Sequence, residues 1–149
     1  MPILTRERGG PAIARQILLM PMLDDRTTTP DPHIEPYLLW SYGDSRTAWP
    51  ALLGDAAGRP DAPATAAPAR LEEATGLPPA CIEVGQLDAS RDEDPAHATK
   101  LSRAGVPVEF HLHPGVPHEC AAQVRRDRGL LRARATGSWR CAARARLPG

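Results

Sequence analysis

Three short apolar segments, each bounded by turn-forming residues, stand out along the chain. Residues 12–20 are mostly apolar and lie between a Gly-Gly-Pro turn and Pro21, and residues 79–84 and 106–112 have a similar character. Short apolar runs bounded by glycine and proline are typical of strands that are buried in a parallel sheet. The pattern therefore predicts three strands.

The segment between the second and third of these strands carries the signals of a helix. Ser90, with Glu93 three residues later, forms a capping-box pattern that marks a helix start. Gly105 supplies a stop after Ala104. A strand, a helix and a strand with short joints form a βαβ unit, so we expect the two strands to be parallel and the crossover to be right-handed.

The remaining segments give weaker signals. Residues 5–8 resemble the last turn of a helix, and residues 24–68 are irregular and rich in proline. Within that stretch, Asp31-Pro32 could start a short helix that runs to Trp40. A second short helix is expected around residues 47–53, with Gly54 at its end.

Composition limits the chain to one domain. Its 149 residues are 42% hydrophobic but only 4% aromatic, so the core must consist mainly of aliphatic side chains and alanine. No apolar run is long enough to cross a bilayer, and the charged start does not resemble a signal peptide. We therefore expect a cytoplasmic protein that does not bind membranes.

The net charge of zero conceals two oppositely charged parts. Residues 1–118 hold 10 Lys and Arg against 16 Asp and Glu, whereas residues 119–149 hold eight Arg and two acidic residues. The composition predicts that residues 121–149 form an atypical, disordered tail rich in Arg and Ala. A basic tail can bind nucleic acid. No aromatic or glycine motif is interleaved with these arginines, and we expect no nucleic-acid partner.

Two residues with catalytic chemistry follow neighbouring predicted strands. Asp88 comes after the second strand, and His118 follows the third strand 118 − 88 = 30 residues later. Functional side chains gather at the carboxyl ends of parallel strands. A carboxylate there can orient a histidine that acts as a base, and this is the chain order of the last two members of a Ser…Asp…His triad. Taken singly, an aspartate in this position is more often a turn or cap residue, and a lone histidine is more often a surface or packing residue.

The sequences around this pair resemble the hormone-sensitive-lipase-like branch of the α/β-hydrolases. GQLDASRDE at residues 85–93 is similar to the family's G-x-x-D-P-L-R-D-E motif. AGVPVEFHLHPGVPH at residues 104–118 is similar to the segment that ends at the family's catalytic histidine. RGGP at residues 8–11, LMPMLD at residues 19–24 and WPALLGD at residues 49–55 resemble the family in the same order.

The resemblance implies the fold and a reaction. We expect an α/β fold in which residues 1–120 form the C-terminal part of a hydrolase sheet with its helices, and residues 31–60 form part of a helical cap. The implied activity is hydrolysis of a small-molecule carboxylic ester, of the esterase or lipase type, with Asp88 and His118 as catalytic residues. The resemblance implies neither a cofactor nor a metal ion.

Two motifs of the family are absent from the chain. Neither the G-D-S-A-G turn that carries the nucleophile nor the H-G-G-G oxyanion motif occurs. GDSRT at residues 43–47 lacks the last glycine of the nucleophile motif, and no predicted strand precedes it, so we do not expect Ser45 to be the nucleophile. The sequence predicts a truncated hydrolase that is inactive alone. A degenerate, non-catalytic hydrolase with a structural or regulatory role is the alternative.

Two further groups of residues have alternative roles. His111, His113 and His118 lie close together in the sequence and could bind a metal ion, but a half-buried strand explains the first two equally well. Leu38, Trp40 and Trp49 could line an acyl pocket in the cap, although ordinary packing within the cap is the simpler interpretation.

Overall fold

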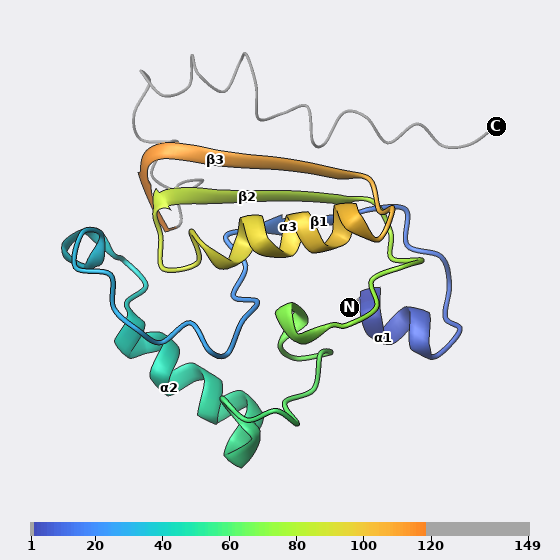
Figure 1. Ribbon diagram of the computed structural model, residues 1–149, viewed down its shortest axis with the longest axis horizontal. Coiled ribbons are helices and arrows are strands. Elements are labelled where there is room, and N and C mark those ends of the chain that lie inside the picture. Colours follow the sequence, from blue (N-terminus) through green and yellow to red (C-terminus); the bar gives the residue numbers. More distant parts are fainter. Residues whose placement is uncertain (1, 119–149) are drawn as a thin grey trace.

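A computed structural model describes residues 2–118 and shows a parallel sheet with helices (Figure 1). The strands are β1 (Gln16–Leu19), β2 (Ala80–Leu87) and β3 (Val108–Pro117), in the order β1-β2-β3. Both neighbouring pairs are parallel, so the α/β fold class and the three predicted strands are confirmed. β1 is shorter than predicted, whereas β2 and β3 extend further. The predicted tail lies outside the described residues.

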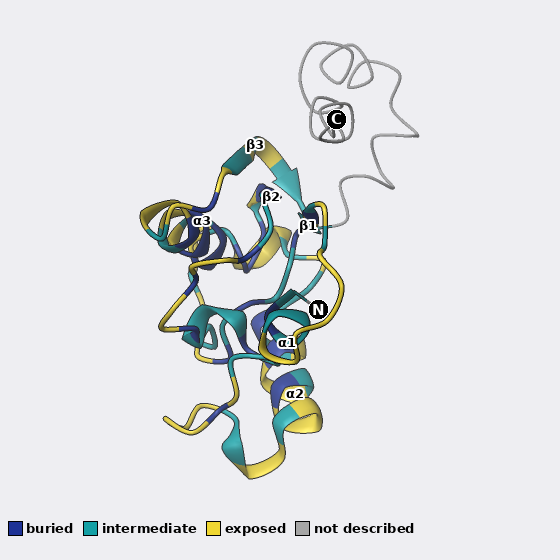
Figure 2. Ribbon diagram, turned by 90° about the vertical axis from the view of Figure 1, so that its right-hand side faces the viewer, coloured by how far each residue is buried: buried dark blue, intermediate teal, exposed yellow. Residues whose placement is uncertain are grey.

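Helix α3 (Glu93–Arg103) connects β2 to β3 and packs along one face of the sheet (Figure 1). Its buried side faces the strands, as Figure 2 shows. Leu101 and Ile82, both fully buried, meet between helix and sheet. Burial of such a side chain contributes about 1.5–3 kcal/mol. The hydrophobic cluster at this interface contains Ile3, Leu71, Ala74, Leu77, Ala80, Ile82, Ala98, Leu101 and Val106.

The capping box predicted at the start of this helix does not form. The helix is preceded by Asp92, and no side chain caps it. The side chain of Glu93 does not bond to Ser90 but reaches the loop after β1. The predicted stop is confirmed, because Gly105 has a φ of 78° and the N–H of Val106 donates to the carbonyl of Leu101.

Helix α2 (Tyr42–Leu53) lies in the predicted cap region and starts earlier than predicted. The hydroxyl of Ser41 accepts from the N–H of Asp44, and the carboxylate of Asp44 accepts from the N–H of Ser41, which is a capping box. The predicted end at Gly54 is confirmed, with a φ of 58°. The helix expected from Asp31 is wrong, since that segment forms only a turn and a 3-10 helix, η1 (Glu35–Tyr37).

Shorter elements complete the chain. Helix α1 (Pro2–Glu7) contains the predicted last turn near residues 5–8, and η2 (Gly54–Ala56) and η3 (Pro68–Arg70) are single turns. A buried ion pair fixes the irregular part of the chain. The guanidinium of Arg70 donates twice to Asp25, at 2.5 and 2.8 Å, and the N–H of Gly58 donates to the same carboxylate at 2.6 Å.

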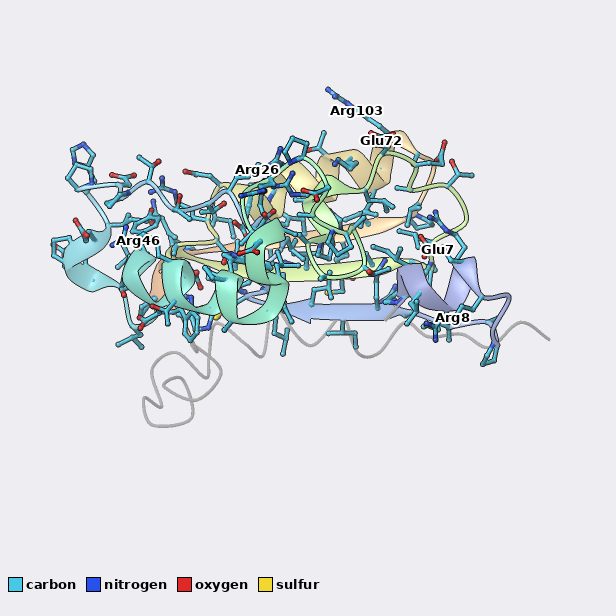
Figure 3. All side chains as sticks on the ribbon, turned by 90° about the horizontal axis from the view of Figure 1, so that it is seen from below. Glu7, Arg8, Arg26, Arg46, Glu72 and Arg103 are labelled. Carbon is cyan, nitrogen blue, oxygen red and sulfur yellow. The ribbon has the colours of Figure 1, made fainter. Side chains whose placement is uncertain are left out.

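Charged and apolar side chains are both present at the surface. Charged side chains such as Arg103 and Arg8 lie at the periphery (Figure 3). On β1, Ile17 and Leu19 are 52% and 57% exposed. Among the described helices, none is long and apolar enough to cross a membrane.

Candidate active site

The structure brings Asp88 and His118 together at the carboxyl ends of β2 and β3. Nδ1 of His118 lies 2.8 Å from Oδ2 of Asp88. The Asp88 side chain is fully buried and the His118 side chain is one-fifth exposed. A buried carboxylate bonded to Nδ1 holds an imidazole in one tautomer and one orientation. The catalytic roles of the two residues stay predictions, but their predicted proximity is observed.

An irregularity between β2 and β3 makes this contact possible. The strands are paired up to Gly85 and His113, and the next pair joins Leu87 to Pro117. Over this interval β2 advances by two residues (87 − 85) and β3 by four (117 − 113). Because the extra residues are absorbed before the strands end, Asp88 and His118 emerge level with each other.

Gly85 is required where the extra residues of β3 are accommodated. A Cβ atom at this position would lie 2.1 Å from the carbonyl oxygen of Val116 and 3.0 Å from that of Pro117. These are backbone atoms of β3, which cannot move aside as a flexible side chain can. Glycine thus permits the close approach of the two strands just before the candidate site.

The second oxygen of Asp88 is also engaged. The N–H of Ser90 donates to Oδ1 at 2.9 Å, and the N–H of Arg91 donates to the carbonyl of Asp88 at 3.1 Å. The loop after β2 therefore turns tightly around the aspartate, and both carboxylate oxygens have partners. Ser90 serves the site through its backbone, a role that its capping-box signal did not indicate.

Glu93 joins the loops that follow β1 and β2. Its Oε1 accepts from the N–H of Leu23 at 2.6 Å and from that of Asp24 at 3.3 Å. Burial raises the pKa of Glu93, while the bonds from these backbone N–H groups oppose the rise. Glu93 therefore holds the loop after β1 against the start of α3, whereas its spacing in the sequence indicated only a helix cap.

Arg91 joins the same loop to the cap segment. Its guanidinium donates to Asp31 at 2.9 Å and to Asp92 at 2.8 Å. The Arg91 side chain is the first cause that lowers the pKa of Asp92, and it adds to the effect of the His33 N–H in lowering the pKa of Asp31. The contact between Arg91 and Asp31 links residues that are 60 positions apart in the sequence.

Two buried ionisable side chains of α3 lie behind the site without hydrogen-bond partners. Asp94 is fully buried, and burial, then Glu93, then Asp88 raise its pKa to about 9. His97 is also buried, its Nδ1 has no partner, and burial lowers its pKa to about 4. Both side chains are therefore neutral at pH 7.

The serine of GDSRT lies inside α2. Ser45 is buried, and its hydroxyl oxygen accepts from the indole N–H of Trp40 at 3.0 Å. It is not at a turn between a strand and a helix, which agrees with its exclusion as nucleophile. Of the three apolar cap residues, Trp49 is buried, Leu38 packs on the cluster of Ile34 and Tyr42, and Trp40 lies beside His118.

The three neighbouring histidines do not converge on one point. Nε2 of His111 lies 3.0 Å from Glu109, and Nε2 of His113 lies 3.3 Å from Glu83, whereas His118 contacts Asp88. Within residues 2–118, one group has ligand-type atoms close enough for a metal ion, within 4.8 Å, and it consists of Cys81, Glu109 and His111. Glu109 is also paired with Arg15, at 3.9 Å. The expectation that no metal is bound stays a prediction.

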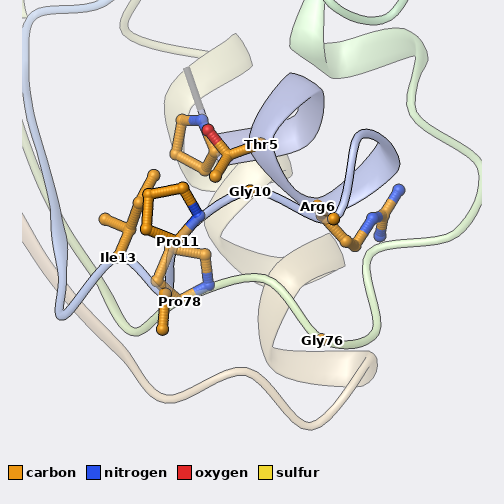
Figure 4. Close-up of a pocket in the computed structure, with 10 residues that line it drawn as sticks. Thr5, Arg6, Gly10, Pro11, Ile13, Gly76 and Pro78 are labelled. Carbon is orange, nitrogen blue, oxygen red and sulfur yellow. The ribbon is translucent and has the colours of Figure 1, made fainter.

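A pocket of about 230 Å³ lies at the opposite end of the sheet (Figure 4). It is bordered by the end of α1 and by the segment that leads into β2, including Arg6, Gly10 and Pro78. Since functional groups in parallel sheets gather at the carboxyl ends of the strands, this pocket is not the candidate substrate site.

A parallel βαβ sheet with an Asp–His pair beyond the carboxyl ends of adjacent strands is the arrangement of an α/β-hydrolase. Residues 1–122 match the model of a protein family described as alpha/beta hydrolase fold. The chain therefore belongs to this family, as its sequence motifs predicted.

Its relatives include bacterial esterases. A carboxylesterase of Mycobacterium tuberculosis, NlhH, is 32% identical over 124 residues, which cover 79% of this chain and 38% of the relative. The solved structure of a bacterial heroin esterase matches with a TM-score of 0.75 at 34% identity, covering 89% of this chain and 43% of that one. A thermostable esterase from Pseudomonas putida matches with a TM-score of 0.69 at 29% identity, covering 79% of this chain and 37% of that one. The chain thus spans about two fifths of the length of these proteins.

Proposed function

We propose that this chain carries the acid and the base of a serine carboxylesterase. The observation that carries the proposal is the 2.8 Å contact between Nδ1 of His118 and the buried carboxylate of Asp88. Hydrolysis of carboxylic esters is supported as the reaction class by the relatives, which bear the names carboxylesterase and heroin esterase.

In this proposal His118 moves protons and Asp88 orients it. Because Nδ1 faces Asp88, Nε2 accepts the proton of a serine hydroxyl while the serine oxygen attacks the ester carbonyl. His118 then gives that proton to the departing alcohol, leaving an acyl-enzyme. A water molecule attacks the acyl group with the same assistance and releases the acid. Asp88 stabilises the imidazolium that forms in both halves of the reaction.

No serine among the 149 residues lies in a G-x-S-x-G nucleophile motif, so the nucleophile of this proposal comes from other polypeptide. Residues 2–118 contain four serines. Ser41 caps α2, Ser45 accepts from Trp40, and Ser102 is exposed on α3. Ser90 follows β2 but lacks the flanking glycines of a nucleophile turn. We therefore expect the serine and the oxyanion donors to be supplied in trans or by a longer chain.

Activity measurements test this assignment. The 149-residue chain is assayed with a short-chain nitrophenyl ester, alone and after co-expression with the N-terminal part of a related esterase. We expect the chain alone to show no turnover above background, and the co-expressed complex to hydrolyse the ester. In that complex His118→Ala should reduce turnover at least about 1000-fold, and Asp88→Asn should also reduce it strongly.

Two results would contradict the proposal in different ways. Turnover by the chain alone that His118→Ala abolishes would contradict the need for an outside serine. A stable complex that does not hydrolyse the ester, or does so equally well with His118→Ala, would contradict the esterase assignment itself. A matched substitution on the same strand, His111→Ala, serves as the control for general damage to β3.

A further inference from the structure

The indole ring of Trp40 lies against the imidazole of His118. The ring centroids are 6.3 Å apart and the ring planes are tilted by 35°. This separation lies within the range of about 4.5–7 Å in which aromatic rings attract each other. We propose that Trp40 is a positioning residue that holds His118 toward Asp88 and stabilises its protonated form. The consequence for catalysis rests on the proposed function, but the contact can be tested without it.

Trp40 is itself held in place by the cap. Its indole N–H donates to the hydroxyl of Ser45 at 3.0 Å, and Ser45 is buried within α2. A half-buried indole with its one donor engaged cannot turn away without losing that bond. The serine that resembles a nucleophile in the sequence therefore anchors the residue beside the base.

The cap segment is joined to the Asp88 loop at two other points. Tyr42 and Ile34 form a buried cluster with Ala89, which directly follows Asp88. Arg91 donates to Asp31 at 2.9 Å, at the beginning of the same segment. These contacts fix the cap segment against the loop, and they thereby place Trp40 relative to Asp88 and His118.

These contacts give Trp40 a function that Asp88 cannot supply. The bond to Nδ1 holds one atom of the imidazole, whereas the indole lies against the ring as a whole. The face of an indole ring is electron-rich and attracts a cation near it. The imidazolium formed when Nε2 takes the serine proton is such a cation, so the contact favours the step that creates it.

An NMR titration of the imidazole of His118 tests the proposal in the full 149-residue chain. We expect Trp40→Ala and Trp40→Leu to weaken proton binding by His118 about threefold, which corresponds to about half a pH unit in its pKa. Trp40→Phe retains an aromatic face and should restore most of the wild-type value. Ser45→Ala should show a smaller decrease, because the indole loses its anchor but remains present.

Two controls give each outcome one meaning. Tyr37→Ala removes an exposed aromatic ring of the same segment and should leave the titration unchanged. Trp40→Leu keeps an apolar side chain, so it remains informative if Trp40→Ala fails to fold. If a folded Trp40→Leu chain showed the same His118 titration curve as the wild type, the proposal would be overturned. If Asp88→Asn leaves the titration unchanged, the Asp88–His118 pair and the proposed function fail instead, whatever Trp40 does.

Discussion

Replacing Asp94 by asparagine should stabilise the chain at pH 8. Asp94 is fully buried without a hydrogen-bond partner, and its pKa is raised to about 9 from an ordinary value near 3.8. Above pH 4 the unfolded chain releases this proton while the folded chain retains it. The free energy of unfolding therefore falls by about 1.4 kcal/mol per pH unit until pH 9.

The size of the effect follows from this slope. Between pH 4 and pH 8 it sums to about 5 kcal/mol, and relaxation around an ionised carboxylate returns part of this. We expect Asp94→Asn to exceed wild type by at least about 2 kcal/mol at pH 8 and to match it near pH 4, as measured by urea unfolding. Asp61→Asn, at an exposed carboxylate, is the control. Equal stability of Asp94→Asn and wild type at both pH values would contradict the prediction.

His97 shapes the acidic side of the same profile. Its pKa is lowered to about 4, so below pH 6.5 the unfolded chain binds a proton that the folded chain does not. Stability from this residue is complete above pH 6.5 and is lost as the pH falls toward 4. In the wild type this loss opposes the gain from Asp94 over the same interval. The Asp94→Asn variant should therefore lose stability between pH 6.5 and 4, and adding His97→Gln should remove that loss.

Gly85→Ala should disrupt both the fold and the candidate site. The new methyl group would lie 2.1 Å from the carbonyl oxygen of Val116, which belongs to the β3 backbone. Overpacking of a well-packed interior typically costs about 1–3 kcal/mol, and a clash with backbone lies at or above the upper end. Relief requires β3 to move away from β2, which would separate His118 from Asp88.

Thermal unfolding and NMR measure the two consequences. We expect Gly85→Ala to lower the melting temperature by about 10 °C or more and to remove the low-field proton signal of the His118–Asp88 bond. Gly43→Ala is the control, because that glycine lies in α2 and its added methyl group would meet only side-chain atoms, the hydroxyl of Ser41 at 3.3 Å and the guanidinium of Arg46 at 3.9 Å. A Gly85→Ala chain with wild-type stability and an intact signal would show that the strands are less tightly constrained than the structure indicates.

Local signals in the sequence sufficed for the strands and for the Asp88–His118 pair. Apolar runs bounded by glycine and proline predicted β1, β2 and β3, since burial in a parallel sheet leaves such a pattern. A βαβ unit aligns the carboxyl ends of its strands, so residues that follow them were expected to meet. The motifs around the pair identified the family, which the family match confirms.

Other residues were misassigned because their partners lie far away in the sequence. Ser90 and Glu93 have the spacing of a capping box, yet Glu93 bonds to the loop after β1, 70 residues from it at Leu23. Trp40 gave only the signal of an apolar cap residue. Its neighbour His118 is 118 − 40 = 78 positions away, and no local pattern could indicate that contact.

The sequence by itself determined the fold class, the parallel βαβ unit, the family and the two side chains of the candidate site, because these depend on periodicity and on short contiguous motifs. Only the tertiary structure decided how that site is held. Four features depend on distance and burial between segments that are far apart in the chain. They are the irregularity of β3 opposite Gly85, the link from Glu93 to Leu23, the unpartnered Asp94 and the contact of Trp40 with His118. Contacts of this kind arise from packing the whole sheet, helix and cap together, and no single segment encodes them.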